Sequence, residues 1–262
     1  MDNLIDIGIN LMHPSFKNDR KEIIDEGIKL GIEKYIITGT TIKSSEIAKD
    51  YALKFPNTLY STAGIHPHNA KDFTDDSLAQ IENLSKFDQV VAIGECGLDY
   101  NRNFSKPQIQ RKVFEKQIEL AEKLNMPLFL HEREAHTDLF NILKKYPDMC
   151  EKSVVHCFTG TKEEALNYIE LGCYIGITGW ICDMKRGKSL QEAVQYIPSN
   201  KMMIETDAPF LIPKNLDEKP KKHRNEPKYL LNVLETISQY TSISKEKLAK
   251  DLRNNTKIFF NI

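Results

Sequence analysis

The sequence predicts an α/β protein with the architecture of a (β/α)8 TIM barrel. Eight apolar, strand-like runs alternate with amphipathic helical stretches along the 262 residues. This alternation is typical of a parallel sheet with helices on both faces, and the length suits the eight repeats of a barrel. The alternative is a doubly wound open sheet, but no G-x-G-x-x-G motif follows the first run, as a dinucleotide-binding fold would require. We therefore expect residues 1–262 to form one barrel domain.

Most of the predicted strands are short runs rich in Ile, Val, Leu or Tyr. Side chains of these types favour buried strands, and polar residues, Gly or Pro separate each run from the next stretch. The eight runs are residues 4–9, 34–39, 59–64, 90–95, 127–131, 153–157, 173–177 and 202–205. The segment 207–226, rich in Pro, Lys and Asp, is predicted to be an excursion from the top of the barrel.

The helix that the pattern defines best spans residues 107–124. Its apolar positions recur on one helical face: Ile109, Val113, Leu120 and Leu124. Capping residues predict helix starts at three places: Ser105 with Gln108, Thr161 with Glu164, and Asn225 ahead of Pro227. Gly172 is expected to end the helix that starts at Thr161.

Composition limits the functional classes. With 40% hydrophobic and 28% charged residues, the chain resembles an ordinary globular protein, and no stretch is apolar enough to span a bilayer.

Acids at the N-terminus argue against a signal peptide, so we expect an intracellular, cytoplasmic protein, or a nuclear one in a eukaryote. Five cysteines without C-x-x-C spacing argue against disulfides and structural zinc. A net charge of −1 leaves no broad basic face, so any phosphate contact must lie inside a cleft.

Polar residues gather where the predicted strands end. They are Asp6, Asn10, His66, His68, Glu95, His131, His156 and Asp207. In a barrel the carboxyl ends of all strands meet on one face, so these side chains should converge. Any one of them alone would more often be structural, but Glu, His, His and Asp together form a ligand set for a divalent metal. A cation would also explain the acids Glu205 and Asp207 after an apolar strand, because buried acids need a positive partner.

Nine motifs follow one another along the chain: DIGIN, ITGT, STAGIHPH, AIGECGLDYNRNFS, NMPLFLHERE, HCFTGTKEE, YIGITGWICD, IETDAP and RNEP. Taken in order, they resemble the TatD-type metal-dependent deoxyribonucleases of the amidohydrolase superfamily. None is decisive alone, but the series runs nearly from end to end and is highly specific. The resemblance implies a TIM barrel of the metallo-dependent hydrolase type.

The resemblance also implies ligands. Glu95, in G-E-x-G-L-D, corresponds to a metal ligand that can bridge two ions, and His131 and His156 correspond to ligands of the same metal. Asp207, in E-T-D-A-P, corresponds to a further ligand that accepts a proton. Glu205 either orients a ligand or makes a buried structural hydrogen bond.

One departure concerns the first strand. Most relatives begin D-x-H-x-H, whereas this chain reads D-x-G-x-N, as in a recognised branch of the family; Gly8 and Asn10 replace the two histidines. We expect one metal at Glu95, His131 and His156, with Asp207 completing it or holding a weaker second ion. There are two alternatives for the first metal position. Either Asn10 supplies one weak oxygen ligand, or Asp6 shifts inward.

The branch implies hydrolysis of DNA from the 3′ end, with a preference for single strands, and of RNA in some members. Asp207 would take a proton from water, and His66 would contact a phosphate oxygen or stabilise charge. His68, Arg102 and Arg224 are candidate phosphate contacts, although both arginines suit surface ion pairs equally well. The family implies Mg²⁺, and the imidazoles suit Mn²⁺ or Zn²⁺.

Two other functions share these features. One is a small-molecule amidohydrolase or lactonase on the same barrel, and the other is a binding protein that lost catalysis along with the first-strand histidines. We expect the binding partner to be DNA, with RNA as a second candidate. We expect no membrane contact and no obligate protein partner.

Overall fold

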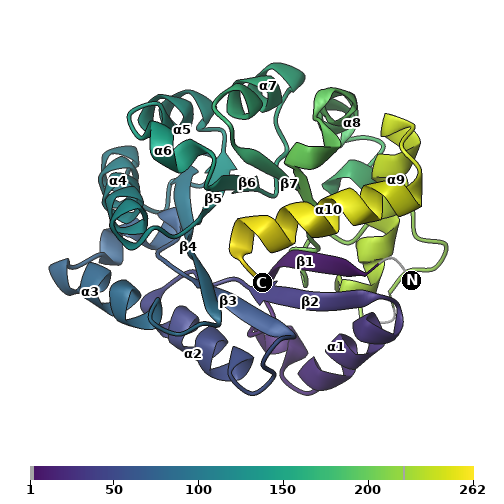
Figure 1. The fold of residues 1–262 in the computed structure, drawn as a ribbon, viewed down its shortest axis with the longest axis horizontal. Helices are drawn as coiled ribbons and strands as arrows, with labels where there is room; N and C mark the ends of the chain where they lie inside the picture. Colours follow the sequence, from purple (N-terminus) through teal and green to yellow (C-terminus); the bar gives the residue numbers. More distant parts are fainter. Residues whose placement is uncertain (1–2, 221) are drawn as a thin grey trace.

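The computed structural model describes residues 3–220 and 222–262. Within them, eight strands form one parallel sheet in sequence order, and the sheet curls into a barrel ringed by helices (Figure 1). The strands are β1 (Leu4–Ile9), β2 (Ile32–Ile37), β3 (Leu59–Ala63), β4 (Val90–Asp99), β5 (Leu128–Arg133), β6 (Ser153–His156), β7 (Tyr174–Ile177) and β8 (Met202–Ile204). This arrangement confirms the predicted (β/α)8 barrel.

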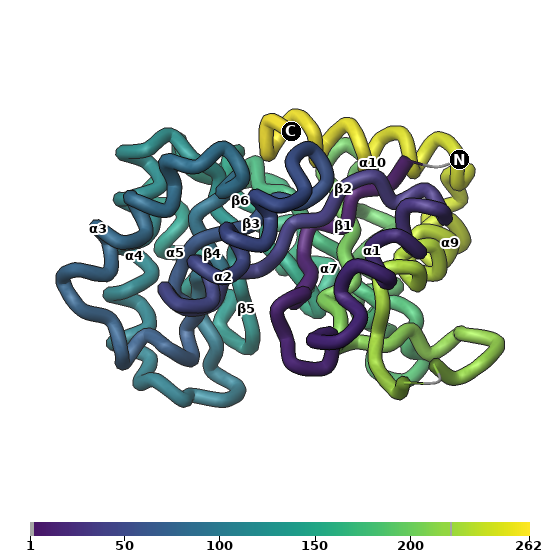
Figure 2. Tube along the Cα trace, turned by 90° about the horizontal axis from the view of Figure 1, so that it is seen from below, coloured from purple at the N-terminus to yellow at the C-terminus, as the bar shows by residue number. Residues whose placement is uncertain are grey.

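The helices surround the sides of the barrel, except for one that lies across its end. They are α1 (Arg20–Lys29), α2 (Ile42–Ala52), α3 (Asp75–Leu84), α4 (Pro107–Leu124), α5 (His136–Leu143), α6 (Pro147–Cys150), α7 (Lys162–Glu170), α8 (Lys188–Ala193), α9 (Leu230–Thr241) and α10 (Lys245–Phe260). The exception is α10, which crosses one end of the barrel (Figures 1 and 2). None of the helices in the described part of the chain is long and apolar enough to cross a membrane.

Two apolar layers hold the barrel together, because alternate strand residues face opposite sides of the sheet. The larger layer lies between strands and helices. The inner layer fills the barrel with Ile7, Ile36, Tyr60, Val91, Ala92, Phe129, Val154, Met203 and Phe260. Phe260 comes from α10, so this helix closes the amino-terminal end of the barrel. The described parts of the segment 207–226, together with other long connections, lie at the opposite end (Figure 2), which leaves that end for function.

The predicted strands are confirmed with small shifts. Every predicted run overlaps an observed strand, and the ends agree within two residues except in β4. The prediction stopped at Glu95, whereas β4 continues to Asp99 and pairs with β5 as far as Arg133. Glycine and aspartate are disfavoured in strands, so only the pairing with β5 explains the extension.

Helix capping was predicted correctly at α7. The Glu164 N–H donates to Thr161 Oγ1 at 3.2 Å and the Thr161 N–H donates to Glu164 Oε2 at 2.7 Å, while Gly172 adopts a φ of 98° after the helix. Predicted capping at Ser105 is wrong, because Lys106 is the N-cap of α4. The Ser105 hydroxyl instead donates to the carbonyl of His68 at 3.0 Å, a tertiary contact that local sequence does not encode.

The third predicted start is displaced by one residue. Glu226 is the N-cap, and a 3-10 turn at Pro227–Tyr229 precedes α9. Asn225 is not the cap, because its side-chain amide donates to the carbonyl of Thr206 at 2.9 Å. Asn225 thereby ties the segment after β8 to the start of α9.

The barrel closes through side chains and single backbone contacts. Among the described residues, no ladder joins β1 to β8; instead, an isolated bridge joins Ile9 of β1 to Ala208 in the segment after β8. Asp6 accepts hydrogen bonds from the Thr206 N–H at 2.9 Å and from Thr206 Oγ1 at 2.5 Å. The Asp6 carboxylate is therefore engaged in closing the barrel.

We predict that Asp6 makes stability depend on pH. Burial raises the pKa of its carboxyl from 3.8 to about 7, although the hydrogen bonds from Thr206 oppose this shift. Between these values the folded protein holds a proton that the unfolded chain lacks, so the free energy of unfolding should fall as the pH rises from about 4 to about 7. Asp6→Asn should remove this contribution. Urea unfolding in EDTA at about pH 5 and about pH 8 measures it, and equal pH dependence of both proteins would contradict the prediction.

Candidate metal centre

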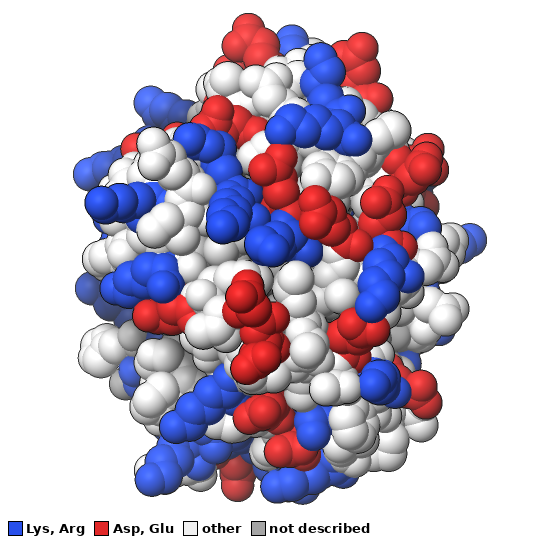
Figure 3. Space-filling view, turned by 90° about the vertical axis from the view of Figure 1, so that its left-hand side faces the viewer, with Lys and Arg blue, Asp and Glu red and all other residues white. Residues whose placement is uncertain are grey.

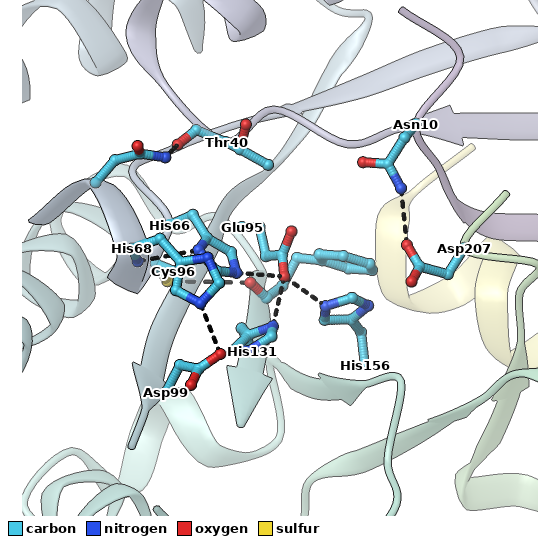
Figure 4. A network of polar contacts seen from close by, with 12 residues as sticks. Asn10, Thr40, His66, His68, Glu95, Cys96, Asp99, His131, His156 and Asp207 are labelled. Carbon is cyan, nitrogen blue, oxygen red and sulfur yellow. Dashed lines mark hydrogen bonds and ion pairs between the residues drawn. The ribbon is translucent and has the colours of Figure 1, made fainter. Parts of the chain in front are cut away.

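Glu95 lies at the centre of a cluster of imidazoles at the carboxyl-terminal end of the barrel. Its Oε1 is 2.7 Å from His131 Nδ1, 2.7 Å from His156 Nε2 and 3.3 Å from His66 Nε2 (Figure 4). β4, β5 and β6 carry Glu95, His131 and His156, and His66 follows β3. The structure therefore brings together the three residues for which the sequence predicted one metal, and adds a third histidine.

The charge state of this cluster suits a cation. Burial opposes ionisation of Glu95, but electrostatic attraction to His66 and His156 and the hydrogen bonds from His131 and His156 hold the pKa of Glu95 well below its usual value. Burial likewise disfavours charged His156, but Glu95 and Glu205 outweigh it and raise its pKa well above the ordinary value. A buried carboxylate that relies on positive imidazoles is a site where a divalent cation can replace their protons.

The second nitrogen of each ring separates the histidines into two kinds. His131 Nε2 lies 3.2 Å from Asp99 Oδ2, and His156 Nδ1 lies 3.3 Å from Glu205 Oε2. A carboxylate on the far nitrogen accepts its proton and leaves the near nitrogen free for a metal, which is the usual arrangement around ligating histidines. Both rings thus have the geometry of ligands that face the Glu95 carboxylate.

His66 differs. Among the described residues, His66, Glu95 and His131 each place one ligand atom within 4.8 Å of the others, so the ring is close enough to join the set. However, its Nδ1 accepts the backbone N–H of His68 at 3.1 Å, which places the proton of the neutral ring on Nε2. Burial lowers the pKa of His66 to about 4, so the ring is neutral near pH 7. A protonated Nε2 is a hydrogen-bond donor, which supports phosphate contact over metal ligation.

Asp207 occupies the β1–β8 side of the same cleft. Its Oδ1 accepts a hydrogen bond from Asn10 Nδ2 at 2.7 Å, and its N–H donates to the carbonyl of Gly8 at 2.8 Å (Figure 4). Burial raises the pKa of Asp207 to about 7, with the charge of His156 opposing the shift and that of Glu95 adding to it. Asn10, predicted as a ligand or substrate contact, therefore orients the Asp207 carboxylate.

Asp99 is the residue that the sequence analysis missed. It is buried, and its Oδ2 lies 2.7 Å from His68 Nε2 and 3.2 Å from His131 Nε2. Burial opposes ionisation, but the hydrogen bond from His131 and the backbone N–H of Arg102 outweigh it and lower the pKa of Asp99. The available clue was alternation, since Asp99 stands four residues after Glu95 and would share its face if the strand continued.

Glu205 is fully buried behind His156. It accepts the backbone N–H of Cys157 at 2.5 Å, and a Cβ on Gly8 would lie 2.2 Å from its Oε2. The carboxylate thus fills the space beside Gly8. In this chain Gly8 makes room for Glu205, and Glu205 orients His156.

We predict that Gly8→Ala destabilises the protein by roughly 1–3 kcal/mol, as overpacking of a close-packed interior does. The added methyl would collide with Glu205 Oε2. Urea unfolding measures the change. Glu205→Ala should relieve the collision, so the double variant should be more stable than the sum of the single changes implies. Additive effects would contradict this account.

The two predicted arginines lie outside the cluster. Arg224 is buried and forms ion pairs with Asp19 at 2.5 Å and Glu226 at 2.9 Å. Of the two roles considered for Arg224, these contacts support the ion pair and not the phosphate contact. Arg102 is exposed, and its backbone N–H donates to Asp99 Oδ1 at 2.8 Å. Neither arginine lines the cleft.

The cleft above the cluster has a volume of about 560 Å³, within the range of small-ligand sites. Glu95, His66, His68, His131, His156 and Asp207 line its polar part. Away from it, charges of both signs intersperse over the face that α3 and α4 form (Figure 3). That face has no broad basic surface, in agreement with the expectation of a local phosphate site.

Comparison with known proteins identifies the family. A family model described as TatD related DNase matches residues 5–261. The 3'-5' ssDNA/RNA exonuclease TatD of Citrobacter rodentium is 42% identical over 259 residues, covering 99% of this chain and 98% of that protein, and its Escherichia fergusonii counterpart is also 42% identical, covering 99% of both.

Solved structures agree. YJJV, a TatD homolog from Escherichia coli K12, superposes with a TM-score of 0.91 at 26% identity over the whole of both chains. A TatD family hydrolase from Entamoeba histolytica gives a TM-score of 0.85 at 27% identity over 98% of both chains. The sequence-based resemblance is thereby confirmed, and the chain belongs to the family of TatD related DNases.

Proposed function

We propose that this protein is a divalent-metal-dependent nuclease that removes nucleotides from the 3′ end of single-stranded DNA and RNA. The observation that carries the proposal is the Glu95 carboxylate, which three imidazoles surround at the base of a cleft. The names of the 42% identical relatives supply the substrate and the polarity. An open cleft at one end of a barrel suits the end of a flexible strand.

Glu95, His131 and His156 would hold the cation, with Mg²⁺ as the first candidate and Mn²⁺ or Zn²⁺ as alternatives. When bound, a divalent cation polarises a phosphoryl oxygen and lowers the pKa of a water molecule. Asp207 would complete the ligand set or hold a weaker second ion. Asp99 and Glu205 keep the two imidazoles in the required orientation through their far nitrogens.

The other residues act on the substrate and the proton. Asp207 is the proposed base, because Asn10 engages Oδ1 and leaves Oδ2 for the proton of the attacking water. His66 Nε2 donates to a phosphoryl oxygen, where charge develops during hydrolysis. His68 lines the same cleft, and Asp99 fixes its ring for a second phosphate contact.

A time course on 5′-labelled single-stranded DNA tests the proposal. Reactions contain Mg²⁺, Mn²⁺ or Zn²⁺, with EDTA as the control, and parallel series use RNA and circular single-stranded DNA. We expect a descending ladder that EDTA abolishes and no cleavage of the circle. Protein that binds metal but cleaves no oligonucleotide would favour the small-molecule amidohydrolase or the inactive binding protein.

A further inference from the structure

We infer that the Phe210 ring is the stacking platform for the base of the 3′-terminal nucleotide, and that it sets the position of the scissile phosphate over Glu95 and the histidines. This inference rests on the proposed nuclease function. It names a substrate-positioning residue that none of the predicted ligands or phosphate contacts includes.

Phe210 has an exposed aromatic ring inside the functional cleft. Its side chain is 50% exposed and lines the same cleft as Glu95 and Asp207. The ring meets His13 edge-to-face, with the ring centroids 5.5 Å apart. An apolar ring that stays half exposed beside a charged site is available to a flat ligand, and every nucleobase offers a face for stacking.

Short backbone turns tie both rings to the proposed base. The Phe210 N–H donates to the Asp207 carbonyl at 3.0 Å, and the His13 N–H donates to the Asn10 carbonyl at 2.9 Å. The side chains of Asn10 and Asp207 are themselves joined at 2.7 Å. The backbones of Phe210 and His13 are therefore held beside Asp207 and Asn10, so a base stacked on Phe210 would place its own phosphate close to the proposed base.

The lining of the cleft combines groups that suit both parts of a nucleotide. Acidic and imidazole groups line it, and Met12, Ile47 and Phe210 add apolar surface. Ser44, which also lines the cleft, is already engaged, because its Oγ accepts the N–H of Thr40 and the N–H of Thr41, at 2.9 and 2.8 Å. The side chains of Met12, Ile47 and Phe210 favour stacking over reading of base edges, which suits a terminal base of any identity.

The test compares single-stranded DNA oligonucleotides that are intact, abasic at the 3′-terminal nucleotide, or abasic at the penultimate one. Wild type should lose roughly 5- to 150-fold in kcat/KM on the terminal-abasic substrate, the range that corresponds to one base–aromatic stack. Phe210→Ala should lose a similar factor on intact DNA and discriminate little between the intact and terminal-abasic forms. Phe210→Tyr, which keeps the ring, should behave as wild type.

Phe87→Ala is the matched control, because Phe87 is 42% exposed and lines a hollow with Phe260 at the opposite end of the barrel. Equal discrimination by wild type and Phe210→Ala would overturn the inference, as would discrimination that follows the penultimate base. If no oligonucleotide is hydrolysed, the proposed function fails separately. Fluorescence anisotropy of the same oligonucleotides in EDTA then still decides whether Phe210 binds the terminal base.

Discussion

Glu95→Ala is expected to reduce bound metal to background and to lower oligonucleotide hydrolysis by at least about 100-fold, since even residues that only orient ligands often matter by 10- to 100-fold. Glu95 Oε1 is the atom on which His66, His131 and His156 converge. Without it, His131 and His156 lose the carboxylate that faces their near nitrogens, although Asp99 and Glu205 still face the far ones. Elemental analysis after desalting measures the metal, and the labelled-oligonucleotide assay measures the activity.

The control for this variant is Glu192→Ala, which removes an exposed glutamate from the outer helix α8. It should retain both metal and activity. Unchanged metal content in Glu95→Ala would refute the ligand set of Glu95, His131 and His156. Metal loss with a retained thermal unfolding transition is the expected pattern, because the barrel core lies below the cluster.

Asp207→Asn is expected to keep the fold and part of the metal while reducing kcat by roughly 10²- to 10⁴-fold, the usual contribution of a general base. The amide keeps an oxygen that can accept from Asn10 Nδ2, so the geometry of the cleft should persist. It cannot accept the proton of water. Steady-state kinetics with saturating metal separates this loss from weaker metal binding.

Asn10→Ala is the companion variant. It removes the hydrogen bond that orients Asp207 but leaves the carboxylate in place, so a smaller loss than that of Asp207→Asn is expected. Full activity of Asp207→Asn would exclude Asp207 as the base. A larger loss in Asn10→Ala than in Asp207→Asn would assign the main role to the amide.

Much of this protein follows from local sequence. Alternation of apolar runs with amphipathic helices predicted eight strands and the barrel, because the period of burial is a local property. Polar residues at the strand ends then predicted convergence of Glu95, His131 and His156, since parallel strands in a barrel align their carboxyl ends. Capping at Thr161 was predictable for the same reason, as its partner lies three residues away.

Other features depend on contacts between residues far apart in sequence. Ser105 looks like a helix cap but hydrogen bonds to the loop at His68, and Arg224 looks available for phosphate but is held by Asp19, 205 residues away. Asp99 became visible only through the pairing of β4 with β5. Each of these side chains has several possible polar partners. Which partner it bonds depends on which one lies within hydrogen-bond distance once the barrel has closed.

The same distinction applies inside the site. The sequence by itself determined which residue types gather at the open end of the barrel. Only the tertiary structure decided that carboxylates face the far nitrogens of His131 and His156, whereas a backbone N–H faces that of His66. The orientation of a ring depends on packing at the scale of a hydrogen bond, and a one-dimensional pattern of polar and apolar residues contains no information at that scale.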